Sequence, residues 1–138
     1  MNDEQELSDA VPDGSVLRVR VGPGSLDEAL QQTRQAMQAA EAGGSVEPAF
    51  TIGFAQMGQM LAVFTPRRWE LVAALREAGP SSVRALAQRL GRDYKNVHGD
   101  VAALVEWMAV QRLPDGRVHV PWREIVLDMH LPTLARAA

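Results

Sequence analysis

The sequence predicts an α+β, mainly helical fold, a winged helix-turn-helix that follows an N-terminal strand-helix extension. Apolar residues recur every three or four positions in successive segments between residues 65 and 108, which is typical of amphipathic helices. Each segment starts at a residue type that favours a helix N-cap. Two short apolar stretches around Pro114-Asp115-Gly116 then predict a β-hairpin. A chain of 138 residues can bury a core without disulfides.

The N-terminal part predicts one strand and one helix. Residues 1–14 are acidic and polar, and we expect them to be disordered. Residues 16–21 alternate apolar and basic side chains, which indicates a strand. Residues 26–41 contain neither glycine nor proline and follow Ser25, a candidate N-cap. Because the apolar stripe of this helix consists mostly of small side chains, we expect residues 15–53 to serve dimerisation or partner binding.

Residues 54–131 are predicted to form the winged helix domain. A short helix is expected first, from the apolar spacing of Phe54, Met57, Leu61 and Phe64. Three longer helices should follow, with Thr65, Ser82 and Asp93 as their N-caps. Pro66 suits the first helical position, and Gly79-Pro80 should end that helix. Gly91 can adopt the left-handed conformation that ends the second helix.

The third helix and the hairpin complete this domain. The helix is expected to face the core with a stripe made of Val97, Val101, Leu104 and Met108. Residues 110–113 and 117–120 should form the two strands of the wing. Residues 124–131 suit a final strand or a short helix, and residues 132–138 form a small tail. Trp69 and Trp107 are expected in the core rather than as stacking platforms for bases.

Charge is divided unevenly along the chain, although the net charge is only −3. Residues 1–64 carry three arginines and nine acidic residues, whereas residues 65–123 carry ten basic and six acidic ones. Since screening limits exposed charges to about 8–10 Å, the basic part can attract a polyanion despite the acidic part. The acidic start, the lack of a long apolar run and the absence of cysteine predict a cytoplasmic protein that does not enter membranes.

The third helix is expected to carry the side chains that contact DNA. An α-helix fits the major groove, where asparagine pairs with adenine and lysine or arginine with guanine. Asn96, Lys95 and His98 are therefore candidate base contacts, and the arginines of the wing can hold phosphate. The predicted DNA-binding residues are Arg84, Arg92, Tyr94, Lys95, Asn96, His98, Arg112 and Arg117. The alternative is a helical domain whose basic face is merely solvated, but helix, tight turn, helix and hairpin follow in the order that DNA binding requires.

Nothing in the sequence favours an enzyme, a cofactor or a metal. The three histidines are not spaced as metal ligands, and no glycine-rich phosphate loop is present. His98 and Asp100 are two residues apart on a helix, so they point in different directions and cannot act as a catalytic pair. We expect no enzymatic activity and no bound cofactor or metal.

Several segments of the chain also resemble a known protein family. Residues 86–98, Leu-Ala-Gln-Arg-Leu-Gly-Arg-Asp-Tyr-Lys-Asn-Val-His, together with residues 65–68 and 120–126, resemble a family of small prokaryotic predicted transcriptional regulators with a MarR-like winged helix. That family includes TumA-type antitoxins encoded beside TumE-type toxins. The resemblance covers roughly residues 50–131 and is specific between Gly91 and Asp100. Family members often have a basic residue after the histidine, where this chain has Gly99.

Two functions follow from these observations. The resemblance implies a dimeric repressor that binds an operator in its own promoter, with an inverted repeat expected for a twofold-symmetric dimer. It also implies neutralisation of a toxin where one is present. The first function is thus an autorepressor that is also an antitoxin, with residues 15–64 expected to bind the partner. The alternative is a stand-alone regulator whose N-terminal part only dimerises. A neighbouring toxin gene distinguishes the two.

Overall fold

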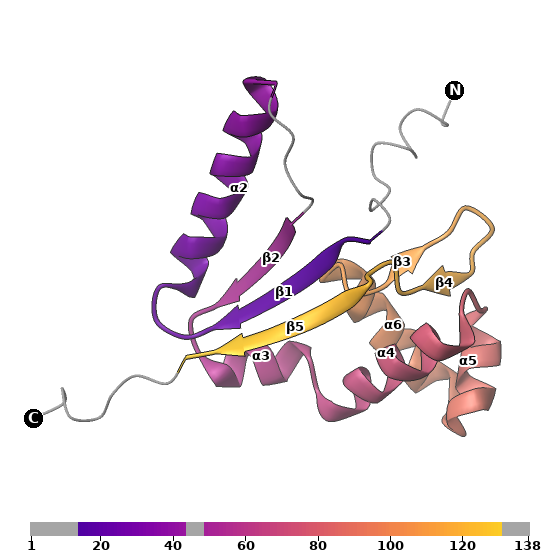
Figure 1. Ribbon diagram of the computed structural model, residues 1–138. Helices are drawn as coiled ribbons and strands as arrows, with labels where there is room; N and C mark the ends of the chain where they lie inside the picture. The colour runs from indigo at the N-terminus through magenta and orange to yellow at the C-terminus, as the bar shows by residue number, and fades with distance from the viewer. Residues whose placement is uncertain (1–13, 44–48, 131–138) are drawn as a thin grey trace, which may run out of the picture. The chain divides into compact units, whose positions relative to one another are not determined.

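The computed structural model describes residues 14–43 and 49–130. Within them the chain is α+β, with five helices and two small sheets (Figure 1). The chain forms two compact units, and unit 2 comprises residues 56–121. Unit 1 comes from the chain before and after this segment. The predicted disorder of residues 1–14 and the predicted tail at 132–138 fall almost entirely outside the described residues.

Unit 1 is built on a three-stranded parallel sheet. Its strands are β1 (Val16–Val21), β2 (Ala49–Phe54) and β5 (Glu124–Met129), in the order β2-β1-β5. In this register Arg18 lies between Thr51 and Val126. The strand predicted at residues 16–21 therefore finds both partners far away in sequence. One of them, β2, was not predicted.

The boundaries of unit 2 differ from those of the domain that the sequence predicts. Residues 124–129 form a strand rather than a helix, and this strand pairs with β1 instead of joining the helices that precede it. The compact unit 2 is consequently shorter than the expected domain at residues 54–131, and Phe54 ends strand β2. Unit 2 is thus an insertion between two strands of one sheet.

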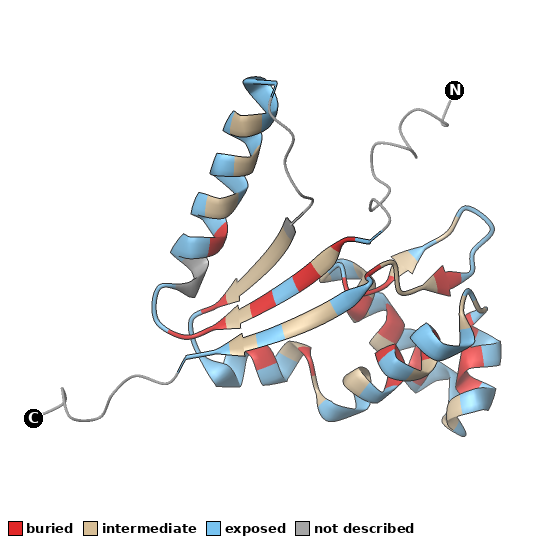
Figure 2. Ribbon diagram, in the orientation of Figure 1, coloured by how far each residue is buried: buried red, intermediate tan, exposed pale blue. Residues whose placement is uncertain are grey.

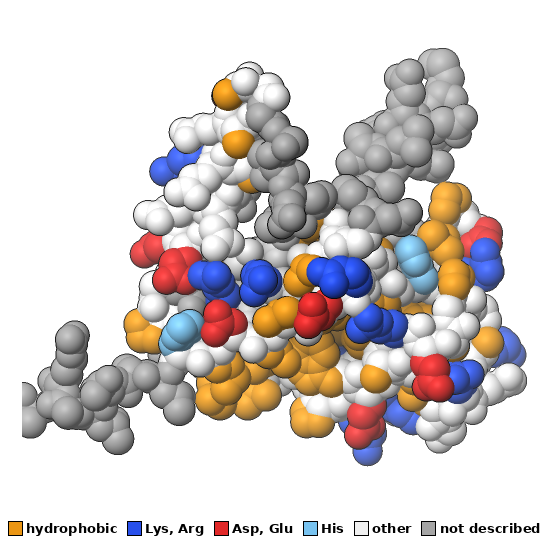
Figure 3. Space-filling view, viewed as in Figure 1, with side chains coloured by type: hydrophobic (Ala, Val, Ile, Leu, Met, Phe, Trp, Pro, Cys, Tyr) orange, Lys and Arg blue, Asp and Glu red, His pale blue; other side chains and the backbone are white. Residues whose placement is uncertain are grey.

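The sheet has one apolar and one polar face. Along β1, Leu17, Val19 and Val21 are buried, whereas Arg18 is exposed and Arg20 half-buried, an alternation visible in Figure 2. Neighbours in register point to the same face of a sheet. The face of the two arginines therefore also carries polar side chains of the flanking strands, and Figure 3 shows charges of both signs over these strands.

Helix α2 (Ser25–Glu41) connects β1 to β2 and packs on the polar face. The Thr51 hydroxyl donates to Gln32 Oε1 at 2.8 Å, and Arg20 Nη1 lies 2.8 Å from Glu28 Oε2. The expected cap is corrected, because Ser25 is the first helical residue and the N-cap is Gly24, which has a φ of 82° and no side chain to accept a hydrogen bond.

The end of β1 requires glycine. Gly22 has a φ of 137°, and a Cβ at this position would lie 2.7 Å from the carbonyl oxygen of His130. The His130 amide donates to the carbonyl of Val21 at 2.8 Å, and the Gly22 amide donates to that of Phe54 at 3.0 Å. Any side chain at residue 22 would push apart the chain segments that leave β1 and β5.

Unit 2 contains the helices and the hairpin that the sequence predicts. They are α3 (Met57–Val63), α4 (Pro66–Ala78), α5 (Val83–Leu90), α6 (Tyr94–Glu106), β3 (Gln111–Arg112) and β4 (Val118–His119). The predicted caps are confirmed, since the side chains of Thr65, Ser82 and Asp93 accept backbone amide hydrogens at 3.2, 3.1 and 3.3 Å. Ser81 also exchanges two backbone hydrogen bonds with Val118, which adds the segment before α5 to the hairpin.

The core of unit 2 follows most of the predicted stripes, but Met108 is exposed, and Trp69 and Trp107 are only half-buried. Val97, Val101 and Leu104 of α6 are fully buried. Met108 is not a core residue, because α6 ends at Glu106 and Met108 has a φ of 70° and a side chain that is 44% exposed. Trp69 is only half-buried, and it stacks on Phe64 with ring centroids 4.7 Å apart.

None of the helices in the described ranges is both long enough and apolar enough to cross a membrane.

Candidate nucleic-acid interface

The connection between α5 and α6 is a tight turn of three residues. Helix α5 ends at Leu90, and Gly91 follows with a φ of 64°, the left-handed conformation predicted for it. The Arg92 amide donates to the carbonyl of Ala87 at 3.1 Å, which satisfies one of the last carbonyl groups of α5. Asp93 then caps α6. The turn and both caps fix the start of α6 against α5.

The first two turns of α6 present polar side chains to solvent. Lys95, Asn96 and His98 are exposed, whereas Val97 between them is completely buried. The buried face anchors the helix, so the exposed side chains lie on a rigid element. Lys95 has no ion-pair partner among the residues that the structure describes. These three predicted contacts are therefore free to meet a ligand.

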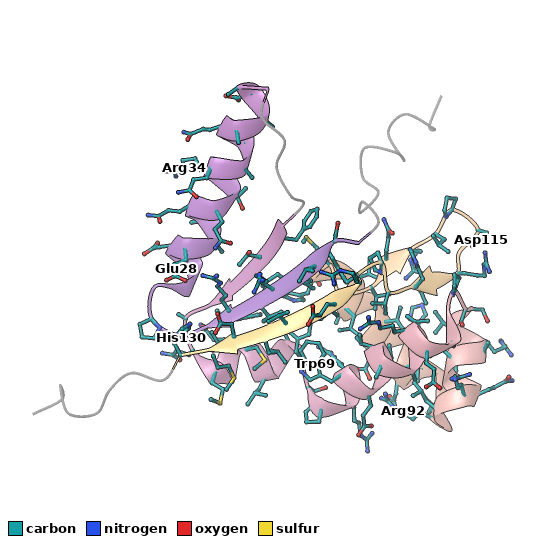
Figure 4. All side chains as sticks on the ribbon, in the orientation of Figure 1. Glu28, Arg34, Trp69, Arg92, Asp115 and His130 are labelled. Carbon is teal, nitrogen blue, oxygen red and sulfur yellow. The ribbon has the colours of Figure 1, made fainter. Side chains whose placement is uncertain are left out.

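Arg92 is held inside unit 2. Its Nη2 lies 2.7 Å from Oδ2 of Asp100, and Arg68 Nε lies 3.1 Å from the other oxygen of the same carboxylate. Arg68 also donates from Nη1 to the carbonyl of Val63 at 2.7 Å. The sequence predicts that Arg92 contacts guanine or phosphate, and the structure places its side chain, only 18% exposed, in an ion-pair cluster that ties α4, α6 and the turn together. Figure 4 labels Arg92 on the ribbon.

This cluster changes the acidity of Asp100. Burial raises the pKa of Asp100, but the hydrogen bonds from Arg92 and Arg68, together with their positive charges, outweigh it and hold the pKa below its ordinary value of 3.8. Asp100 is thus ionised at neutral pH, and both guanidinium groups keep their partner. Nη1 of Arg92 is buried without a hydrogen bond to any described residue.

Arg84, Tyr94 and His98 form a small cluster beside the start of α6. The Arg84 guanidinium lies 5.6 Å from the centre of the Tyr94 ring, a cation–π distance. The rings of Tyr94 and His98 are 5.8 Å apart, one helical turn from each other. Tyr94 remains 47% exposed. The structure therefore brings three of the predicted residues together at the junction of α5 and α6.

The two arginines of the hairpin differ. Arg117 is engaged by Asp115, whose carboxylate accepts from the Arg117 amide at 3.0 Å and from its Nε at 2.7 Å. The hydrogen bond from the Arg117 amide has the largest effect, and together the two bonds hold the pKa of Asp115 below its usual range. Arg112 is exposed on β3 and has no ion-pair partner in the described part of the chain. Arg112 therefore presents more available positive charge than Arg117.

The ion pair of Arg68 was not found from the sequence, whereas Gly99 stands out there as a departure from the family that the chain resembles. Arg68 lies 32 residues before Asp100, so no local spacing indicates their ion pair. Gly99 lies in the middle of α6, on the same side as Lys95 and Asn96, and a Cβ there would have no neighbour within 4 Å. Glycine weakens a helix relative to alanine. Because no contact within the described residues requires it, the lack of a side chain at residue 99 leaves the helix backbone open to close approach.

Unit 2 also has an excess of basic residues, which favours the binding of a polyanion. Residues 56–121 carry nine basic and six acidic residues. Three of the acidic side chains, Glu77, Asp100 and Asp115, pair with arginines. Within the described ranges, no three histidine or acidic side chains gather closely enough to hold a metal ion.

Comparisons with known proteins give one match. Residues 63–127 match the family HVO_A0114, and the description names no activity, ligand or partner. The matched segment runs from the end of α3 into strand β5 and so includes the whole of the region described above. No curated protein and no solved structure matches the chain.

Proposed function

We propose that the chain is a sequence-specific transcriptional repressor that binds double-stranded DNA through unit 2, a winged helix-turn-helix. It acts as a homodimer on an inverted repeat in its own promoter. The observation that carries the proposal is the first two turns of α6, where exposed Lys95, Asn96 and His98 flank the fully buried Val97. In a helix-turn-helix, this part of the second helix faces the base edges in the major groove.

The chemistry of the exposed side chains suits base edges. The Asn96 amide can donate to N7 and accept from the amino group of adenine, and the Lys95 ammonium can donate to O6 and N7 of guanine. His98 can serve either base or phosphate. All three are polar and lie within one turn, and α6 is anchored by its buried face. Such a surface offers hydrogen bonds but no hydrophobic patch, which favours a polar ligand such as DNA over a protein core.

Groups around α6 can bind the phosphate backbone. Arg112 is exposed on the hairpin, and Arg84 lies over Tyr94 at the beginning of α5. Phosphate contacts set the register of a protein on DNA and give affinity that falls with salt. Arg92 has a positioning role in this account, because its ion pair with Asp100 fixes the turn that precedes α6.

The resemblance to TumA-type antitoxins extends the proposal. It implies that the repressor also neutralises a toxin encoded by a neighbouring gene and that the toxin binds the N-terminal part of the chain. The alternative is a stand-alone dimeric regulator. Mixing the purified chain with the product of the adjacent gene distinguishes the two, since an antitoxin forms a stable complex and a stand-alone regulator does not.

A titration tests the DNA-binding proposal. The purified chain is added to a labelled duplex of its own upstream promoter and to a scrambled duplex of equal composition, at about 50 and 200 mM salt. We expect a preference for the promoter and an affinity that falls by about 10–100-fold between the two salt concentrations. Equal binding to both duplexes would refute sequence-specific recognition, and no binding at low salt would refute the function.

A matched control separates recognition from general charge. Lys95→Ala should reduce the preference for the promoter, whereas Arg18→Ala removes the same charge from an exposed position on the central strand β1 of unit 1. We expect Arg18→Ala to bind as the wild type does. An equal loss in both variants would mean that only the total charge matters.

A further inference from the structure

Helix α2 has little to pack against among the described residues of unit 1. It spans 17 residues, yet Ala29 is the only side chain buried among those described along it. Leu30 and Met37 are 62% and 60% exposed. Most of the stability of a protein helix comes from packing one of its faces, and a single buried alanine supplies little of it. The exposed apolar side chains therefore indicate a surface that is covered in the working protein.

The exposed apolar side chains form a line beside the face that rests on the sheet. We call this line the docking stripe, and it consists of Leu30, Thr33, Met37 and Ala40. The spacing of three, four and three residues is that of a coiled-coil seam, and long and short side chains alternate along it. Helical geometry places the stripe about a quarter-turn from Ala29 and Ala36, which face the strands.

The direction of the stripe follows from contacts on the other side of α2. Glu28 reaches Arg20 on the central strand β1, and Gln32 reaches Thr51 on the edge strand β2. The stripe lies on the opposite side of the helix from Glu28, so it points away from β1 and past β2. The outer edge of β2 has no strand partner among the described residues. An apolar stripe and an open strand edge thus lie on one side of unit 1, and both need covering.

Charges of alternating sign run along the outer border of the stripe. Asp27, Arg34 and Glu41 follow one another at intervals of seven residues, on the side of α2 that faces away from the strands, where Figure 4 shows Arg34. Glu28 is already paired with Arg20. Asp27 and Arg34 are exposed, with no ion-pair partner in residues 14–43 or 49–130.

We propose that the docking stripe binds α2 of a second copy of this chain, with the two helices antiparallel. A twofold interface must be complementary to itself, and the border charges satisfy this condition in one register. With Leu30 opposite Thr33 of the second copy, each Asp27 faces the other copy's Arg34, so that two ion pairs form. A shift of one heptad would bring the two Arg34 side chains together. In a parallel pair, Ala29 and Ala36 would occupy the positions opposite these charges, and no ion pair would form.

This interface deepens the proposed function, since it supplies the homodimer on which that function rests. The interface rests on the exposed side chains of α2 and not on DNA binding. Its test therefore measures mass and not affinity for a duplex, so that the two proposals can fail separately.

Sedimentation equilibrium of the full-length chain tests the interface. We expect a mass twice that of the 15.1 kDa chain. Leu30→Lys with Met37→Lys should give a monomer. The control is Gln31→Lys with Gln38→Lys, which adds the same charge to exposed positions of α2 outside the stripe, and it should remain a dimer. A monomeric wild type, or a dimeric Leu30/Met37 variant, would overturn the proposal.

A charge exchange tests the antiparallel register. Asp27→Arg alone and Arg34→Asp alone should each raise the dissociation constant of the dimer by about tenfold, because two ion pairs become two repulsions. The double variant should return to within about threefold of the wild type. A double variant that is as weak as the single ones overturns this register. A wild-type dimer that does not bind promoter DNA would support the interface and refute DNA binding. A monomer that binds the promoter would refute the interface and support DNA binding.

Discussion

The guanidinium of Arg92 lies 2.7 Å from the carboxylate of Asp100, and this ion pair joins the turn before α6 to the second turn of that helix. Arg68 of α4 approaches the other carboxylate oxygen at 3.1 Å. One carboxylate thus links α4, the turn before α6 and α6 itself. It also engages the guanidinium of Arg92 within the chain, so the position of the exposed face of α6 depends on Arg92.

Asp100→Asn is expected to destabilise unit 2. The variant keeps the size of the side chain but removes the charge that holds Arg92 and Arg68, which should lower the free energy of unfolding by about 1–3 kcal/mol. Urea denaturation measures this loss. Glu106→Gln is the control, because Glu106 is exposed on the same helix and has no ion pair to a described residue. Equal midpoints for the two variants would argue against a stabilising cluster.

The same carboxylate predicts a dependence of stability on pH. The pKa of Asp100 is lower in the folded chain than its ordinary value of 3.8, so the ionised form stabilises the fold above that value. This contribution disappears as the pH falls through the lowered pKa. Between pH 5 and about pH 2 the unfolding free energy of the wild type should therefore fall more steeply than that of Asp100→Asn. Parallel curves for the two proteins would contradict the shift.

Local signals in the sequence predicted unit 2 well. The caps at Thr65, Ser82 and Asp93 and the left-handed Gly91 are all present, because each depends only on residues three or four positions away. The prediction that Met108 lies in the core was wrong. The apolar spacing continues past residue 106, but spacing alone does not show where a helix ends.

Long-range pairing was much harder to predict. Strand β1 was found, but its partners β2 and β5 come from segments on either side of the 66-residue unit 2. The period of a strand does not reveal which strand it pairs with. Neither ion pair of Asp100 was predicted from the sequence. Arg68 lies far from Asp100 in sequence, and Arg92 was expected to contact DNA instead. The exposure of Lys95 and Asn96, by contrast, follows directly from the helical period.

Asn96→Ala should relax the base preference rather than abolish binding. Loss of a bidentate contact with adenine should cost about 1–3 kcal/mol at one position of each half-site and little at the others. Competition with duplexes that carry single base changes measures this effect. A uniform loss of affinity across all the duplexes would instead assign Asn96 to the backbone.

Gly99→Ala should stabilise the protein while weakening DNA binding. Alanine favours the helix by about 0.5–1 kcal/mol, and its Cβ would meet nothing within 4 Å in the chain. The methyl group would, however, stand on the side of α6 that carries Lys95 and Asn96. A higher melting temperature with unchanged affinity for the promoter would show that this part of α6 does not approach DNA closely.

The hairpin should bind phosphate mainly through Arg112. Arg112→Ala is expected to weaken binding to all duplexes alike and to lower the salt slope by about one per lost contact. Arg117→Ala should have a smaller effect, because Asp115 already binds its guanidinium. Asp115→Asn should raise the affinity by releasing Arg117. Salt-dependent titrations of the three variants measure these differences, and an Arg117→Ala effect as large as that of Arg112→Ala would contradict this assignment.

The measurement that tests the central claim most directly is a titration of the ¹⁵N-labelled full-length chain with its promoter duplex, followed residue by residue by NMR. The account predicts that the amide signals of Lys95, Asn96, His98 and Gly99 shift most, that Arg112 follows, and that α2 changes little. Shifts confined to unit 1, with α6 unaffected, would contradict DNA recognition by this helix.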